Sequence, residues 1–179
     1  MPVRIYPYYG FIGAPFPRGV NYSRGLNVLG KKFAAIEGVT VLPGRANWLS
    51  QSDFMADARA HPAAKKVAIG HSMGVYAITQ LAARTPDVTW DLMLAFDPSP
   101  GYGTLGLWRC ASLGANVKKA LVFRSTNWLN PIGHGYLHTG ADFTGKLETI
   151  GIARLHQNVP NDEAAQAMSV RAVRELAER

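Results

Sequence analysis

A pentapeptide in the first half of the chain has the residue types needed for nucleophilic chemistry. Residues 70–74 read GHSMG, a G-x-S-x-G pattern, between the apolar run KVAIG and the helically spaced run VYAITQLAAR. A sharp strand-to-helix turn at this place would hold the Ser72 side chain at a helix N-terminus, where backbone N–H groups favour negative charge. The flanking glycines allow one stretch of backbone to approach another. The pattern therefore predicts Ser72 as a nucleophile that attacks a carbonyl, and the competing interpretation is a tight structural turn.

A serine hydroxyl becomes a useful nucleophile when a base takes its proton and an acid orients that base. Asp97 directly follows the run WDLMLAF, which is the next predicted strand after the motif. Its carboxylate is therefore expected at the same sheet edge as Ser72. The alternative for Asp97 is a turn-forming role before Pro98, and Asp142 is the second candidate for the acid.

Five histidines compete for the role of the base. His156 is the predicted base, because it directly follows the last predicted strand and precedes the final helix. His134 and then His138, both in a long loop, are the alternatives. His61 precedes the strand that leads to the motif, and His71 is assigned to packing. No third ligand accompanies the pair in the loop, so neither a metal site nor another cofactor is expected.

The elements that must position these residues follow from short apolar runs that alternate with helical patterns, which is typical of a parallel sheet covered by helices. The expected fold is a single-domain, three-layer α/β/α sandwich with a mostly parallel sheet of about six strands. The best-defined helix is the last, which Asn161 or Asp162 can cap. The six expected strands are Val3–Tyr9, Val39–Leu42, Lys66–Gly70, Trp90–Phe96, Val117–Phe123 and Leu147–Leu155.

Length and composition limit the function classes. The chain of 179 residues fits one domain, 1–179, and its 47% hydrophobic residues with only 17% charged residues exclude an intrinsically disordered chain. The single cysteine, Cys110, excludes an internal disulfide. No apolar run approaches the ~20 residues of a membrane span, and the N-terminus lacks a signal-peptide pattern. Cytoplasmic location is expected, with a mature secreted form or a phage product left open.

The net charge of +7 favours an anionic surface or polymer as a partner. Solubility alone is the alternative explanation of this charge. Nucleic-acid binding is not expected, because no nucleic-acid motif accompanies the scattered lysines and arginines.

The GHSMG motif resembles the nucleophile elbow of lipases and esterases of the α/β-hydrolase family, and the order of strands and helices fits this family over nearly the whole chain. The resemblance is to small bacterial lipases that lack the first two strands, and it implies a minimal fold without a large cap domain. Most members carry the acid one strand later, but here that strand ends Phe123–Asn127 without a carboxylate. Some lipases carry the acid where Asp97 stands, with a similar Asp-Pro pair. The segment from His156 to the final helix resembles the family's catalytic histidine loop, and His156 also completes the family's chain order of serine, acid and histidine.

The same resemblance implies an oxyanion hole made of two backbone N–H groups. One belongs to Met73, the residue after the serine, and the other to Phe11, with Ile12 as the alternative. Family members often read His-Gly where this chain has Tyr9-Gly10.

Aromatic and polar residues of the long loops are candidates for substrate binding, namely Tyr102, Trp108, Trp128 and His134. Ordinary packing under long loops is the alternative. The expected function is hydrolysis of a small-molecule or lipid-like carboxylic ester through an acyl-enzyme. A thioesterase or amidase would use the same machinery, and an inactive hydrolase-like binding or structural protein is the remaining hypothesis.

Overall fold

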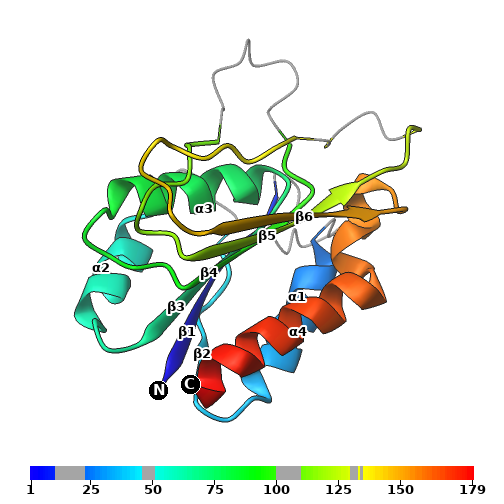
Figure 1. Ribbon diagram of the computed structural model, residues 1–179. Coiled ribbons are helices and arrows are strands. Elements are labelled where there is room, and N and C mark those ends of the chain that lie inside the picture. Colours follow the sequence, from blue (N-terminus) through cyan, green and yellow to red (C-terminus); the bar gives the residue numbers. More distant parts are fainter. Residues whose placement is uncertain (11–22, 46–50, 100–109, 130–132, 134) are drawn as a thin grey trace.

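Six parallel strands form one sheet in the order β2-β1-β3-β4-β5-β6 (Figure 1). The computed structural model describes residues 1–10, 23–45, 51–99, 110–129, 133 and 135–179. All six expected strands are confirmed, with every pairing parallel rather than most. The strands are β1 (Val3–Tyr8), β2 (Val39–Val41), β3 (Lys65–His71), β4 (Leu92–Phe96), β5 (Lys119–Ser125) and β6 (Lys146–Ile152).

Helices cover both faces of the sheet, so the expected three-layer sandwich is confirmed. Helices α2 (Ser52–Ala60) and α3 (Met73–Arg84) lie on one face, and α1 (Arg24–Ala34) and α4 (Glu163–Glu178) lie on the other (Figure 1). The described connections between the strands add no separate cap layer. Across the described parts of the chain, none of the helices has the length and apolar character needed to cross a lipid bilayer.

Each face of the sheet buries its own apolar cluster. On the α2–α3 side, the Tyr6 ring meets Phe54 and Trp90 edge-on, with ring centroids 5.4 and 5.2 Å apart. On the α1–α4 side, the rings of Phe96 and Phe123 stack with centroids 4.8 Å apart. Because the central strands β3 and β4 are buried on both faces, they read as continuous apolar runs rather than as an alternation.

The strand order reverses direction once. From β1 the chain moves outward to β2, returns across β1 to β3, and then continues in order to β6. In open α/β sheets, ligands bind at the carboxyl ends of the strands where this reversal occurs. That point lies between the ends of β1 and β3, and Gly10 and Ser72 are the residues found there.

Three details at the C-terminal end refine the expectation from the sequence. The last strand ends at Ile152 rather than Leu155, because the chain turns there and the Arg154 N–H donates to the Ile152 carbonyl. His156 was expected in a loop but begins a 3₁₀ helix, η1 (His156–Asn161). Asp162 then caps α4, because its side chain accepts a hydrogen bond of 3.0 Å from the Ala165 N–H.

Candidate active site

Ser72 occupies the sharp turn between β3 and α3. Its φ of 57° and ψ of −123° lie in a region that side chains rarely adopt, at a cost of about 1–3 kcal/mol. Two hydrogen bonds hold the turn: the Ser72 N–H donates to the Phe96 carbonyl, and the Val75 N–H donates to the Ser72 carbonyl, each at 3.0 Å. The surrounding structure therefore fixes this strained conformation.

The two glycines of the motif are required by close packing. A Cβ on Gly70 would overlap the backbone of Gly74, and a Cβ on Gly74 would overlap the Tyr8 carbonyl. The turn thus fits against β1 only because both positions lack a side chain.

Asp97 directly follows β4, the strand that neighbours β3, and it is fully buried. The register pairs His71 with Phe96, so Ser72 and Asp97 follow paired residues at the ends of adjacent strands. The Asp97 Oδ1 accepts a hydrogen bond of 3.0 Å from the Ser125 N–H. Its backbone also has a positive φ of 41°, which aspartate tolerates better than most residues.

His156, at the start of η1, contacts the second oxygen of this carboxylate. Its Nδ1 lies 2.8 Å from the Asp97 Oδ2, and both side chains are buried. The imidazole therefore donates its Nδ1–H to the carboxylate, which leaves Nε2 as the nitrogen that can accept a proton. The structure brings these two predicted residues into direct contact across 59 residues of sequence.

Gly133 covers the Asp97–His156 hydrogen bond. Its φ is +95°, and a Cβ built on it would lie 2.8 Å from the His156 Nδ1 and overlap the Asp97 carboxylate. Only glycine fits at this position without moving the pair.

One of the two groups expected to form an oxyanion hole lies within the described residues. Met73 is the first residue of α3, where backbone N–H groups have no acceptor within the helix. The end of β1 passes close to the serine, since a Cβ on Gly10 would lie 2.9 Å from the Ser72 Cβ. Phe11 and Ile12, the candidates for the second donor, lie outside the described residues.

The alternative residues from the sequence have other partners or lie elsewhere. Asp142 accepts a hydrogen bond from the Ala115 N–H at 3.2 Å, and the Nδ1 of His61 lies 2.9 Å from the Asp57 carbonyl. His138 is exposed, and Trp128 is 85% exposed. Tyr102, Trp108 and His134 lie outside the described residues, so their predicted contacts with substrate stay predictions.

Solved structures with this architecture are found, although no protein-family model and no curated protein matches the sequence. A protein assigned to the alpha/beta hydrolase superfamily from Xanthomonas campestris pv. campestris is 15% identical, with a TM-score of 0.53 and 98% of each chain covered. A metagenome-derived lipolytic enzyme is 16% identical, with a TM-score of 0.62, 97% of this chain and 94% of that chain covered. The RedJ thioesterase of prodiginine biosynthesis in Streptomyces coelicolor is 13% identical, with a TM-score of 0.59, 97% and 85% covered.

The chain has the α/β-hydrolase fold. At these identities the likeness establishes the fold alone, so the chemistry must be argued from the residues at the carboxyl edge of the sheet. Two contributors to that edge were missed in the sequence. Ser125 contributes its backbone N–H, which every residue except proline has, so its residue type does not indicate this contact. Gly133 lies in a long connection after β5, and the sequence does not indicate where that connection runs.

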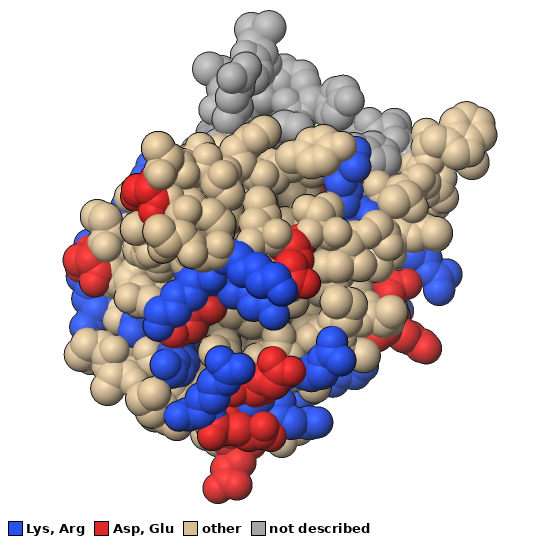
Figure 2. Space-filling model, in the orientation of Figure 1, with Lys and Arg blue, Asp and Glu red and all other residues tan. Residues whose placement is uncertain are grey.

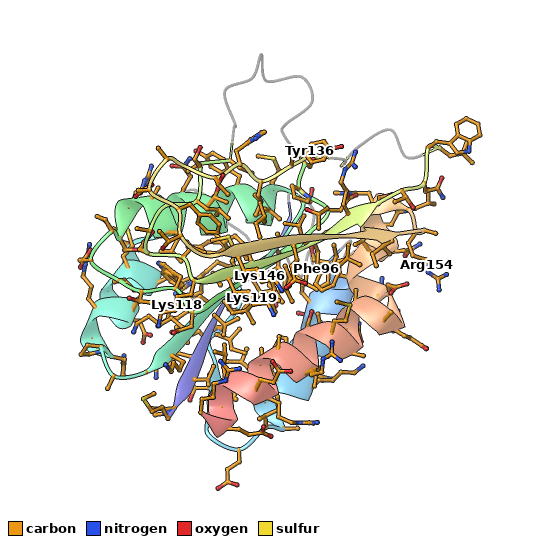
Figure 3. The ribbon with its side chains drawn as sticks, viewed as in Figure 1. Phe96, Lys118, Lys119, Tyr136, Lys146 and Arg154 are labelled. Atoms are coloured by element: carbon orange, nitrogen blue, oxygen red, sulfur yellow. The ribbon has the colours of Figure 1, made fainter. Side chains whose placement is uncertain are left out.

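A second group of charged side chains lies at the opposite, amino-terminal edge of the sheet. Asp91, just before β4, accepts from the Lys118 Nζ at 2.9 Å and the Lys66 N–H at 3.0 Å, and Lys65 Nζ lies 3.8 Å away. These residues line a cavity of about 560 Å³. Lys118 lies at this edge and Arg154 beyond the carboxyl ends of the strands (Figure 3). On the face of the molecule drawn in Figure 2, acidic side chains lie among the lysines and arginines.

Proposed function

We propose that the protein is a serine hydrolase that cleaves a carboxylic ester through an acyl-enzyme on Ser72. His156 is the general base and Asp97 is the acid that orients it. The observation that carries the proposal is the buried hydrogen bond between Asp97 and His156, at the same carboxyl edge of the sheet as a serine held in a strained strand-to-helix turn.

The first half of the reaction forms the acyl-enzyme. The Nε2 of His156 takes the hydroxyl proton of Ser72 while the Oγ attacks the ester carbonyl carbon. Asp97 holds the imidazole in the tautomer with a free Nε2 and stabilises the positive charge that develops on it. The proton then passes from Nε2 to the departing alkoxide, the ester C–O bond breaks, and the acyl group stays on Ser72. Water next attacks this acyl group with His156 again as the base, which releases the acid and restores the serine.

Charge on the carbonyl oxygen must be stabilised in both halves. The Met73 N–H at the start of α3 is one proposed donor, and the end of β1 supplies the second, with Phe11 as the predicted residue. Removing one such donor typically costs about 10²–10³ in rate. The helix N-terminus adds to this stabilisation because its dipole favours negative charge.

A thioester is the second candidate for the substrate. Thioesters react through the same serine, base and oxyanion donors, and one structure of similar fold is a thioesterase. Hydrolysis of esters and thioesters that share one acyl group separates the two candidates, because kcat/KM compares their transition-state binding directly.

Reaction with a fluorophosphonate, read by intact mass, tests the proposal. The wild-type protein should gain one phosphonyl adduct, which Ser72→Ala should abolish. Ser72→Ala should also lower the hydrolysis of p-nitrophenyl esters by about 10⁴-fold or more. The matched control is Ser52→Ala, which removes an exposed hydroxyl at the start of α2 and should change neither result.

A folded wild-type protein without an adduct and without esterase or thioesterase activity would contradict the proposal. The hydrolase-like binding protein would then be the better interpretation of the fold.

A further inference from the structure

We propose that His71 is a positioning residue that holds the backbone of His156, so that its imidazole stays in place between Asp97 and Ser72. The inference rests on the proposed function. It assigns a role in the reaction to the variable residue of the G-x-S-x-G motif, which was expected to do no more than pack.

A directed chain of hydrogen bonds passes through the His71 side chain. The Gly10 N–H donates to the Ser23 Oγ at 3.2 Å, and the Ser23 Oγ lies 3.0 Å from the His71 Nδ1. The His71 Nε2 lies 3.1 Å from the His156 carbonyl oxygen. That carbonyl can only accept, so Nε2 must carry the proton and donate it.

The neutral state of His71 fixes the direction of the other hydrogen bonds in this series. Its side chain is buried, and burial, together with the nearby His156, lowers the pKa of His71 to about 3, although Asp97 and the bond to the His156 carbonyl oppose this shift. A neutral imidazole with its proton on Nε2 has an unprotonated Nδ1, which accepts from the Ser23 hydroxyl. Each hydrogen bond in the chain therefore has one direction.

The contacts hold His156 from two sides. Asp97 binds its Nδ1, whereas His71 binds its carbonyl oxygen and places its ring 4.8 Å from the His156 ring, with 32° between the ring planes. A side chain whose ring nitrogen and backbone are both anchored has little freedom to rotate away from the serine. This is the kind of support that keeps a proton-transfer geometry productive, since a displacement of 1 Å can cost about 10²-fold in rate.

The same chain joins the pieces of the site to one another. Gly10 lies beside Ser72, and Ser23 precedes α1. Helix α1 packs closely on η1, since a Cβ on Gly25 would overlap the backbone of Pro160. His71 thus connects the end of β1, the start of α1 and the start of η1 to the strand that carries the nucleophile.

Two substitutions separate the hydrogen bonds from the volume of the side chain. Glutamine places an amide donor near the position of Nε2, and asparagine places a carbonyl acceptor near the position of Nδ1. His71→Gln should keep the bond to His156 and retain kcat within about threefold, whereas His71→Asn should lower kcat by about 10–100-fold with KM little changed. Thermal unfolding of both variants serves as the control for folding.

The downfield proton resonance of the His156 Nδ1–H gives a second measurement that does not need activity. It should persist in the wild-type protein and in His71→Gln, and broaden or disappear in His71→Asn. Equal loss of kcat in both variants, or no loss in either with an unchanged resonance, would overturn the inference. If the wild-type protein reacts with no fluorophosphonate, the proposed function fails, but the resonance still decides whether His71 positions His156.

Discussion

Strand β4 lies between two buried aspartates that have opposite surroundings. Asp91 precedes the strand and pairs with the ammonium groups of Lys118 and Lys65, which are charged before any reaction occurs. Asp97 follows the strand and contacts the His156 imidazole and the Ser125 N–H. The aspartate before β4 therefore has cationic partners at all times. The aspartate after β4 contacts an imidazole that gains a positive charge only during the proposed reaction.

The difference shows that a cavity lined by charged side chains does not by itself mark the best candidate for chemistry. The 560 Å³ cavity lies beside Asp91, where the carboxylate has cationic partners already. Backbone strain is instead confined to the other edge, because the described non-glycine residues with positive φ are Ser72 and Asp97. Strain of this kind persists where the surrounding structure enforces it, and it gathers at functional sites.

The largest effect should come from Asp97→Asn. An asparagine amide would favour the other tautomer of His156, with the proton on Nε2, and the base could no longer accept the serine proton. Esterase activity should fall about 10³–10⁴-fold while the protein stays folded. The measurement is kcat/KM with p-nitrophenyl esters, together with the rate of phosphonylation. Activity within tenfold of the wild type would assign the acid to another residue.

Asp91→Asn should do the opposite, lowering stability rather than activity. Loss of its charge leaves the ammonium groups of Lys65 and Lys118 without their anion and weakens the hydrogen bond from the Lys66 backbone N–H, at a cost of about 1–3 kcal/mol in the free energy of unfolding. Urea unfolding measures this cost, and kcat/KM should stay within about twofold. Lys118→Met is the matched control, because its side chain is largely exposed and should cost under about 1 kcal/mol. A large loss of activity in Asp91→Asn would remove the contrast between the two ends.

Lowering the pH should reduce the free energy of unfolding, because His71 at the carboxyl edge of the sheet is held neutral in the folded protein. The unfolded chain takes up a proton there below its ordinary pKa of about 6.5, but the folded protein does not until the pH approaches about 3. The groups that face it are His156, which disfavours its charge, and Asp97, which favours it. The free energy of unfolding should therefore fall as the pH is lowered from 6.5 towards 3, by about 2 kcal/mol at pH 5.

Urea unfolding at pH 7 and pH 5 measures this loss. His71→Gln should lose less stability than the wild type over the same interval, whereas Asp91→Asn should keep the wild-type slope. Equal slopes in His71→Gln and the wild type would contradict the assignment to His71.

Most of the fold was predictable from the sequence because the central strands β3 and β4 are buried on both faces and read as apolar runs. Strand β4 shows this well, since all five of its residues are buried. The ends of elements were less predictable. The 3₁₀ helix at His156 contains Pro160. Proline usually indicates where a regular helix ends, so nothing in the sequence indicated a helix here.

The residues with chemical side chains in the candidate site were also predictable, but the groups that support them were not. Ser72, Asp97 and His156 follow from a motif, a strand end and the chain order. The support comes from the Ser125 backbone and from the left-handed turn at Gly133, and neither depends on a residue pattern nearby in sequence. His71 was visible in the motif, yet its partners Ser23 and His156 lie 48 and 85 residues away.

The exclusively parallel sheet sets the order in which the protein can become functional during synthesis. Each pairing joins strands separated by a crossover, and the first strand lies inside the sheet against β3, with Val3 aligned to Lys65. Contacts so distant in sequence form late and slowly. A nascent chain that has released β3 already contains the nucleophile, but its base lies 59 residues beyond the acid and its last helix further still. Under the proposed function, the serine therefore stays unactivated until the C-terminal segment has left the ribosome, so that a truncated product would carry no hydrolytic activity.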